Sequence, residues 1–232
     1  MKNLILISLF FLSITGKTFA AMEDDPILTK FMLNEFETSD EAGNPLSLNA
    51  QMWIGKDLNK FWIKTEAEQE DGRTEESEIQ LLYSKAIAPY WDVQIGVRQD
   101  TVSQIDREWA VVGLEGLAPY FFEINTALFI GESGQAVIRL EAEYELMLTQ
   151  KLVLSPEVEA NFYVKDDLDR GTGTGLSNLE TGIRLRYEIK REFAPYIGIT
   201  WNNLFGKSAD IAETAGDETN SSAFVIGVRT WF

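Results

Sequence analysis

The chain of 232 residues contains no cysteine and no histidine. Without cysteine it can form neither a disulfide nor a thiolate metal site. Without histidine it has no imidazole ligand for a metal and no base for Ser-His-Asp chemistry. Lipases and proteases that depend on a catalytic histidine are thereby excluded, and we expect the chain not to be an enzyme, although chemistry by carboxylates alone stays open.

Positive charge is also scarce. The sequence has 20 Lys and Arg against 37 Asp and Glu, and its formal net charge is −17. Such an acidic protein repels nucleic acid and attracts cations. We therefore expect cations, and no nucleic acid, among its partners.

Long apolar runs are missing after the N-terminus, so no transmembrane helix is expected. The N-terminus itself carries Lys2, an apolar run from Leu4 to Ile14, and the small-x-Ala sequence Thr18-Phe19-Ala20. This order is typical of a signal peptide, and an anchor helix is the less favoured alternative because no stop-transfer pattern follows. The sequence predicts a signal peptide over 1–20, cut after Ala20, and one domain over 21–232.

The last nine residues alternate between two faces. Phe224, Ile226, Val228, Thr230 and Phe232 share one face, while Val225, Gly227, Arg229 and Trp231 share the other. This segment resembles the C-terminal strand of outer-membrane β-barrels, which the assembly machinery recognises by its terminal Phe and apolar face. In such barrels the outer face meets lipid and the inner face meets a polar lumen. We expect outer-membrane lipid and, through Phe232, the assembly machinery as partners.

The same alternation recurs along the chain and predicts about twelve strands of membrane-crossing length. The predicted spans are 28–37, 46–55, 60–69, 77–86, 90–99, 107–116, 119–130, 136–148, 152–164, 177–189, 193–204 and 222–232. Together they predict an all-β fold, a closed antiparallel transmembrane β-barrel.

The predicted connections alternate in length, as in bacterial outer-membrane barrels. Short turns are expected at 55–59, 87–89, 116–118, 149–151 and 190–192; longer polar loops are expected at 38–45, 70–76, 100–106, 166–176 and 206–221, with a shorter one at 131–135. The triplet Ala-Pro-Tyr recurs at 88–90, 118–120 and 194–196. We expect each tyrosine to lie at a turn, at the membrane interface.

Charged residues occupy every second position of several predicted strands. Charge on the lipid side would cost about 2–4 kcal/mol per Arg or Lys near the midplane, so these residues should face the lumen. Five glutamates from two neighbouring strands are candidate metal ligands: Glu141, Glu143, Glu145, Glu157 and Glu159. They predict either a hard-cation site in an acidic lumen or a salt-bridge network with Arg98, Arg139, Arg184 and Arg186.

Methionines are the remaining candidate metal ligands. Met22, Met32, Met52 and Met147 could bind a soft metal ion such as Cu(I) through their thioethers if they cluster; otherwise they are apolar filler. Two further stretches are expected to be loops. The acidic stretch Glu66–Glu78 could bind divalent ions or stand as a solvated outer loop. The glycine-rich stretch Asp166–Gly175 matches neither a calcium loop nor a phosphate loop, and is predicted to be a flexible surface loop.

Several segments together resemble the copper resistance protein B (CopB) family. They are Trp53–Glu66 (WIGKDLNKFWIKTE), Leu82–Asp92 (LYSKAIAPYWD), Gly96–Arg98 (GVR), Gly116–Tyr120 (GLAPY), Arg139–Tyr144 (RLEAEY), Leu148–Leu152 (LTQKL), Gly175–Glu180 (GLSNLE), Arg184–Glu188 (RLRYE) and Arg191–Gly198 (REFAPYIG). The resemblance implies an outer-membrane barrel in copper homeostasis that binds copper or passes it across the membrane. No cofactor other than copper is implied.

The chain departs from the family pattern in two places. Family members commonly carry a Met- and His-rich segment after the signal peptide, whereas 21–49 here offers only Met22 and Met32. Where the family often reads Gly-Val-Arg-His-Asp, this chain reads Gly96-Val-Arg-Gln-Asp100. The alternatives to a copper conduit or copper buffer are a structural or adhesion barrel with a closed lumen, and a soluble periplasmic carrier.

Overall fold

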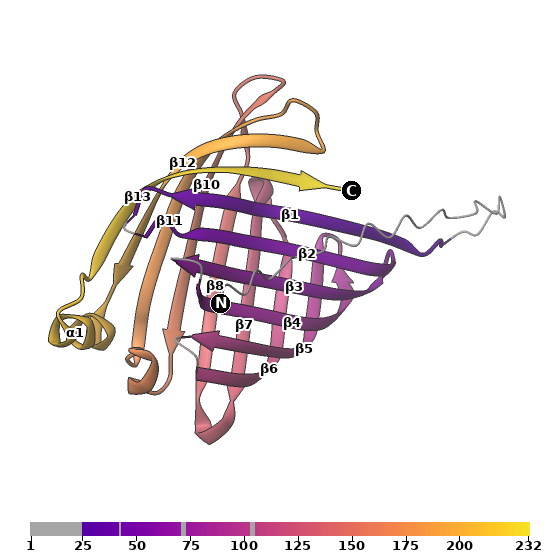
Figure 1. Cartoon of the computed structure of the whole chain (residues 1–232). Coiled ribbons are helices and arrows are strands. Elements are labelled where there is room, and N and C mark those ends of the chain that lie inside the picture. Colours follow the sequence, from indigo (N-terminus) through magenta and orange to yellow (C-terminus); the bar gives the residue numbers. More distant parts are fainter. Residues whose placement is uncertain (1–24, 42, 71–72, 103–104) are drawn as a thin grey trace, which may run out of the picture.

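The computed structural model describes residues 25–41, 43–70, 73–102 and 105–232. The predicted signal peptide, its cleavage site and Met22 lie outside these residues. Strands form one antiparallel sheet that closes on itself (Figure 1). Their bounds are β1 (Leu28–Ser39), β2 (Leu46–Lys56), β3 (Asn59–Glu70), β4 (Arg73–Ala88), β5 (Trp91–Val102), β6 (Ile105–Ala118), β7 (Phe122–Gly131), β8 (Ala136–Tyr144), β9 (Leu146–Met147), β10 (Leu152–Tyr163), β11 (Gly175–Tyr187), β12 (Phe193–Leu204) and β13 (Asn220–Trp231).

The wall has twelve strands because β8 and β9 are two parts of one strand. Both pair with β10, and only Glu145 separates them. The barrel closes where β1 pairs with β13. There the backbones of Phe31 and Phe232 exchange two hydrogen bonds, of 3.0 and 2.9 Å. The predicted closed antiparallel barrel is confirmed, and each of the twelve predicted spans falls on a wall strand.

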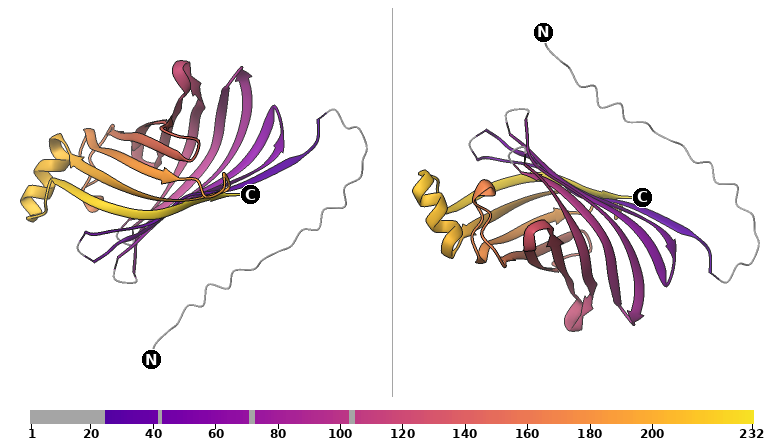
Figure 2. Two further views of the ribbon diagram at one scale, coloured as in Figure 1. Left: turned by 90° about the horizontal axis from the view of Figure 1, so that it is seen from above. Right: turned by 90° about the horizontal axis from the view of Figure 1, so that it is seen from below.

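The two ends of the barrel differ. We call the end with β1's first residue and Phe232 the termini end; its connections are the turns at 57–58, 89–90, 119–121, 148–151 and 188–192. The other end, the loop end, carries the β10–β11 connection and helix α1 (Gly206–Ala215). Figure 2 shows α1 projecting beyond the strands at this end. No helix within the described residues is long and apolar enough to cross a bilayer.

Several predicted loops are regular structure instead. The predicted loops 70–76 and 100–106 are largely strand, because pairing continues to Glu70 with Arg73 and to Val102 with Ile105. Helix α1 occupies most of the predicted loop 206–221. The glycine-rich stretch, expected to be a flexible surface loop, is a connection that contains a short 3₁₀ helix, Leu168–Arg170, and a bridge between Asp167 and Thr172, with Asp167 and Gly173 buried.

The predicted turn position of the Ala-Pro-Tyr tyrosines is confirmed at two of three sites. Tyr90 and Tyr120 lie at turns of the termini end, are 77% and 82% exposed, and have φ values of 66° and 67°. The left-handed backbone lets both rings project at the rim. Tyr196 was expected in the same place but is buried within β12, where its hydroxyl donates to Glu37 at 2.8 Å. β12 starts one residue before this triplet, so strand alternation directs Tyr196 inward.

Inside the barrel, part of the bore is apolar rather than charged. Inward residues that are direct cross-strand partners form a row from β2 to β10: Trp53, Trp62, Leu82, Gly96, Val111, Phe129, Val137 and Tyr163. Trp62, Leu82, Val111, Phe129 and Val137 belong to one buried cluster. Side chains thus fill part of the bore, as expected for a barrel of moderate strand number. The outer face is also apolar, with Ile197 and Phe224 59% and 65% exposed.

Candidate functional site in the bore

A second inward row of partners is polar and acidic. It runs through Asp92 (β5), Glu115 (β6), Asn125 (β7), Glu141 (β8), Glu159 (β10), Glu180 (β11), Asn202 (β12) and Ser221 (β13), each residue being the direct partner of the next. We call these eight residues the carboxylate row. It starts one residue after the first residue of β5, at the termini end, and finishes one residue after the first residue of β13, at the loop end.

The row spans the barrel height because the strands of a closed barrel are tilted and staggered. A line of hydrogen-bonded partners therefore climbs the wall as it passes from strand to strand. Since every member projects a side-chain oxygen, the row lines the bore with oxygen ligands from one mouth to the other. Carboxylate and amide oxygens are the ligands that hard cations use.

Lysines hold the two carboxylates nearest the termini end. Asp92 pairs with Lys60 at 3.1 Å and accepts a hydrogen bond from Ser84 at 2.8 Å. Glu115 pairs with Lys64 at 2.8 Å. A lysine carries one compact charge on a flexible stem, so it can release its partner more readily than a bidentate arginine can.

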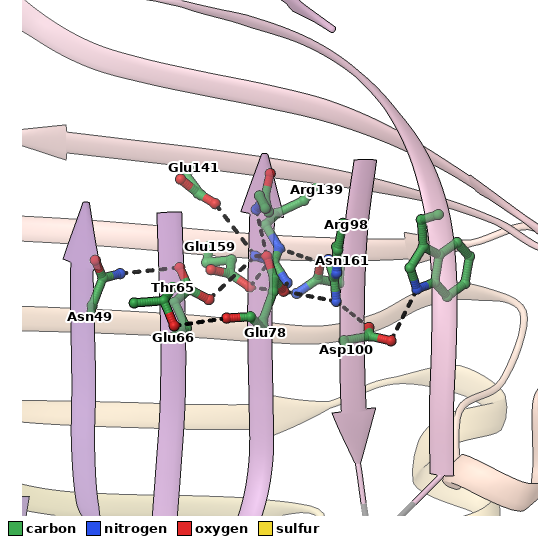
Figure 3. A network of polar contacts seen from close by, with 12 residues as sticks. Asn49, Thr65, Glu66, Glu78, Arg98, Asp100, Arg139, Glu141, Glu159 and Asn161 are labelled. Carbon is green, nitrogen blue, oxygen red and sulfur yellow. Dashed lines mark hydrogen bonds and ion pairs between the residues drawn. The ribbon is translucent and has the colours of Figure 1, made fainter. Parts of the chain in front are cut away.

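Arg139 lies at the centre of a network of carboxylates on the inside of the barrel (Figure 3). Its side chain is 11% exposed and lies 3.1 Å from Glu78, 3.5 Å from Glu66, 3.4 Å from Glu159 and 3.9 Å from Glu141. One guanidinium therefore serves four carboxylates. Arg98 is a second cation on Glu78, so this level of the bore holds four carboxylates for two arginines.

The acidic stretch that was expected to be a solvated loop contributes to this network. Glu66 and Glu78 are partners on β3 and β4, and the Glu78 side chain is 8% exposed. Arg98 pairs with Glu78 at 2.8 Å and with Asp100 at 2.5 Å. The guanidinium of Arg98 also stacks on Phe129, with 4.4 Å from its carbon to the ring centroid. The apolar row and the ion pairs are therefore packed against each other.

A second network lies nearer the termini end. Arg184 is bound by Glu37 at 2.8 Å, by Glu35 at 3.3 Å and by Glu157. Its Nε also donates to Glu37 at 3.0 Å, so this contact is bidentate. Bidentate pairs of this kind are strong and fix geometry. Arg184 thereby joins β1, β10 and β11 across the inside of the wall.

Two further arginines complete this network. Arg186 lies 2.6 Å from Glu145, and Arg229 lies 3.3 Å from Glu143 and 3.2 Å from Glu145. With Glu157 on Arg184 and both Glu141 and Glu159 on Arg139, each of the five glutamates predicted as metal ligands is ion-paired with an arginine. The predicted salt-bridge network forms with Arg139, Arg184 and Arg186, whereas Arg98 pairs with Glu78 and Asp100 instead, and Arg229 was not among the predicted partners.

Glu180 differs from the other carboxylates of the row. It accepts no hydrogen bond and forms no ion pair with any residue that the structure describes, although it lies between Glu159 and Asn202 in register. It is half-buried on the inner face. Sequence alternation placed Glu180 on this face, but its lack of a counter-ion depends on which residues lie opposite, which the sequence alone does not give.

The methionines are not gathered in one place. Met32 packs against the buried cluster of the bore, whereas Met52 on the outer face is 41% exposed. Met147 is 64% exposed at the termini end. Within the described residues, no group of three or more Asp or Glu side chains is arranged to hold a metal ion together. Ligation of copper by the five glutamates or by these methionines stays a prediction.

Glu35 and Glu37 were not found from the sequence, for an identifiable reason. The pairing of β1 with β2 shifts between Leu33 and Glu35. Such a bulge moves later residues to the opposite face. Met32 therefore faces inward at an even position, and Glu35 and Glu37 face inward at odd ones, so the period-two pattern of β1 is interrupted where its acidic residues begin.

Comparison with known proteins assigns the chain to a family. The family model described as "Copper resistance protein B precursor (CopB)" matches residues 27–232. The chain belongs to the CopB family. Copper resistance protein B of Escherichia coli is 46% identical over 198 residues, which are 85% of this chain and 67% of that protein. The Copper resistance protein B homolog of Pseudomonas syringae pv. tomato is 42% identical over 212 residues, 91% of this chain and 72% of that protein.

Solved structures confirm the architecture of this CopB family member. The NanC porin matches with a TM-score of 0.55 at 11% identity, covering 88% of this chain and 99% of the porin. The KdgM porin matches with a TM-score of 0.54 at 12% identity, again covering 88% and 99%. At this identity the likeness concerns the fold alone. The chain is thus a porin-like barrel of a copper resistance family.

Proposed function

We propose that this CopB family member resides in the outer membrane and supports copper tolerance by binding or passing copper ions along the carboxylate row. One observation carries the proposal. In the ion pairs within the bore and its mouth, among described residues, fourteen carboxylates share nine lysines and arginines. An acidic bore with low-dielectric walls raises the local concentration of cations.

The ligand chemistry favours one oxidation state. The row offers carboxylate, amide and hydroxyl oxygens, which accept Cu(II) more readily than Cu(I), because soft Cu(I) prefers thiolate or thioether. The chain has no cysteine, and its described methionines lie apart. We therefore infer Cu(II) as the ion that the bore handles. Family membership supports copper as the metal, because the two relatives are named for copper resistance.

Outer-membrane placement rests on three supports. The fold is porin-like, the outer face is apolar, and β13 presents an alternating pattern that reaches Trp231 beside Phe232. In this placement the termini end faces the periplasm and the loop end faces outward. Cleavage after Ala20 would release the chain from the inner membrane, and Phe232 would engage the assembly machinery.

Growth across a copper series tests the function. Deleting the gene should lower the copper concentration that halves growth, and the wild-type gene should restore it. The variant Glu141→Gln with Glu180→Gln removes two charges from the row and should restore it only in part. Its matched control, Glu213→Gln with Glu218→Gln, removes two exposed carboxylates at the loop end and should restore tolerance fully. Equal growth of all strains would contradict the copper assignment.

Metal analysis of the refolded barrel tests the ion. We expect Cu(II) to be retained on dialysis and Cu(I) to be retained poorly. Retention of Cu(I) alone would contradict the carboxylate row as the site and would favour the methionines.

A second candidate is a structural barrel with a closed bore. The buried apolar row and the arginine networks favour it, since both fill space inside the wall. It predicts no effect on copper tolerance and no metal retention, so the same two experiments separate the candidates.

A further inference from the structure

The β10–β11 connection, residues 164–174, folds over the mouth at the loop end. We call it the mouth loop. From its place between β10 and β11 it reaches side chains of β5 and β6, although β7 and β8 lie between these strands in the wall. It therefore crosses the opening rather than following the rim.

Two ion pairs attach the mouth loop to β5 and β6; in one the arginine belongs to the wall, and in the other it belongs to the loop. Arg107 of β6 donates to Asp167 of the loop, from Nε and from Nη2, both at 3.3 Å. Arg170 of the loop donates to Asp100 of β5 at 3.2 Å. The side chains of Arg170 and Asp100 are only 6% and 3% exposed. Gln135 adds a hydrogen bond to Asp167 at 2.9 Å.

The other side of the mouth loop is held by helix α1. The backbone N–H of Gly173 donates to the Ser208 hydroxyl at 2.8 Å, and the Ser208 and Ser177 hydroxyls are 2.7 Å apart. A Cβ at Gly173 would lie 2.4 Å from Cβ of Lys207, so only glycine permits this approach. The helix therefore fixes the loop's base by close backbone contact.

The two sides differ in how they can be released. The attachment to α1 combines close packing around Gly173 with the contacts of Ser208 and Lys207, whereas the attachment to the wall consists of charged and polar contacts alone. Two glycines follow the charged segment in left-handed conformations, Gly171 with φ 68° directly after Arg170 and Gly175 with φ 97° at the start of β11. Glycine reaches such values without strain, so Gly171 provides a pivot on the C-terminal side of the charged segment.

We propose that the mouth loop is a gate, latched by Arg107–Asp167 and Arg170–Asp100, that closes the bore at the loop end. Asp100 also pairs with Arg98, which pairs with Glu78, so the latch is continuous with the ion pairs of the bore. The gate would limit passage of any small ion. It goes beyond the proposed copper function, because its action does not depend on which metal the bore handles.

Single-channel conductance in planar bilayers with potassium chloride tests the gate without copper. The wild-type barrel should rest in a low-conductance state with rare openings. The variant Arg107→Ala with Arg170→Ala should conduct several-fold more and spend most of its time open. The control Lys190→Ala with Arg191→Ala removes the same charge from a turn of the termini end and should behave as wild type.

Folding is monitored by the difference in gel migration between boiled and unboiled samples. If the alanine variant fails to fold, Arg107→Gln with Arg170→Gln replaces it, because glutamine keeps more of each side chain while removing its charge. A folded variant with unchanged conductance, or a wild-type barrel that is already open, would overturn the gate. A variant that loses copper tolerance but gates normally, or one that gates abnormally but keeps copper tolerance, separates this inference from the copper proposal.

Discussion

Tyr196 of β12 and Gly227 of β13 are direct cross-strand partners, and a Cβ at Gly227 would lie 2.6 Å from the hydroxyl and the Cζ of Tyr196. The phenol ring therefore covers the glycine. From this position its hydroxyl reaches Glu37. Trp109 covers Gly131 in the same way on β6 and β7, with 2.7 Å to the nearest ring atom.

Gly227→Ala is expected to destabilise the barrel. The added methyl group would force the Tyr196 ring away and disturb its hydrogen bond to Glu37, and overpacking of this kind costs about 1–3 kcal/mol. Urea unfolding of the refolded barrel measures the change. Gly113→Ala is the matched control, since its nearest neighbours would be at an ordinary 3.4 Å or more. Equal effects at both glycines would contradict the close contact.

Arg184→Met is expected to be the more damaging change. It leaves Glu35, Glu37 and Glu157 without their shared counter-ion, and breaking a buried pair from one side costs about 3–5 kcal/mol. The same unfolding experiment applies. Arg191→Met, at an exposed turn, should change stability by less than about 0.5 kcal/mol. The Arg184 network would be incidental if the two variants unfolded alike.

Arg139→Met should increase the preference of the bore for cations. The change removes the one positive charge shared by Glu66, Glu78, Glu141 and Glu159, while the side chain keeps a similar length. The reversal potential across a potassium chloride gradient reports this preference. Arg73→Met at the exposed loop end serves as control. A shift toward anions would show that these carboxylates do not line the ion path.

Asp166 gives the mouth loop a pH dependence. Hydrogen bonds from the Thr174 hydroxyl and backbone N–H, and then from Lys207, lower the pKa of Asp166 to about 2. A lowered carboxyl pKa means that this contact stabilises the loop fully above the ordinary pKa of 3.8 and is lost as pH falls toward 2. The carboxyl ¹³C shift of Asp166 should therefore titrate near pH 2 in detergent.

The cause of this lowered pKa can be tested with two variants. Thr174→Val removes the hydroxyl bond and should raise the titration midpoint more than Lys207→Met, because the Thr174 contact is the larger cause. A larger effect of Lys207→Met would reverse that order.

The sequence was sufficient to predict the wall. Strand existence and facing follow from period-two alternation, which lipid contact enforces on every strand. The mouth was harder to predict. Its loop contacts depend on Arg107 and Asp100 meeting residues sixty and seventy positions away, and no local pattern encodes such a pairing. Helix α1 was missed because the polar composition of 206–221 resembles that of a loop.

The candidate site was predicted in part. The inward glutamates of β8 and β10 were found because their strands alternate regularly. Glu35 and Glu37 were missed because a bulge shifts the pattern of β1. The partners of Glu141 and Glu159 were anticipated by residue type, yet the sharing of one Arg139 among four carboxylates comes from strand order and stagger, which the sequence does not specify.

The members of the carboxylate row belong to different strands and follow a helical line around the inside of the wall. Each member lies beside the next only because backbone pairing fixes their relative heights. A slip of two residues between β7 and β8 would place Asn125 beside Arg139 instead of Glu141 and would insert a positive charge into the row. Backbone hydrogen bonds, which carry no charge selectivity of their own, thus determine whether the row is continuous.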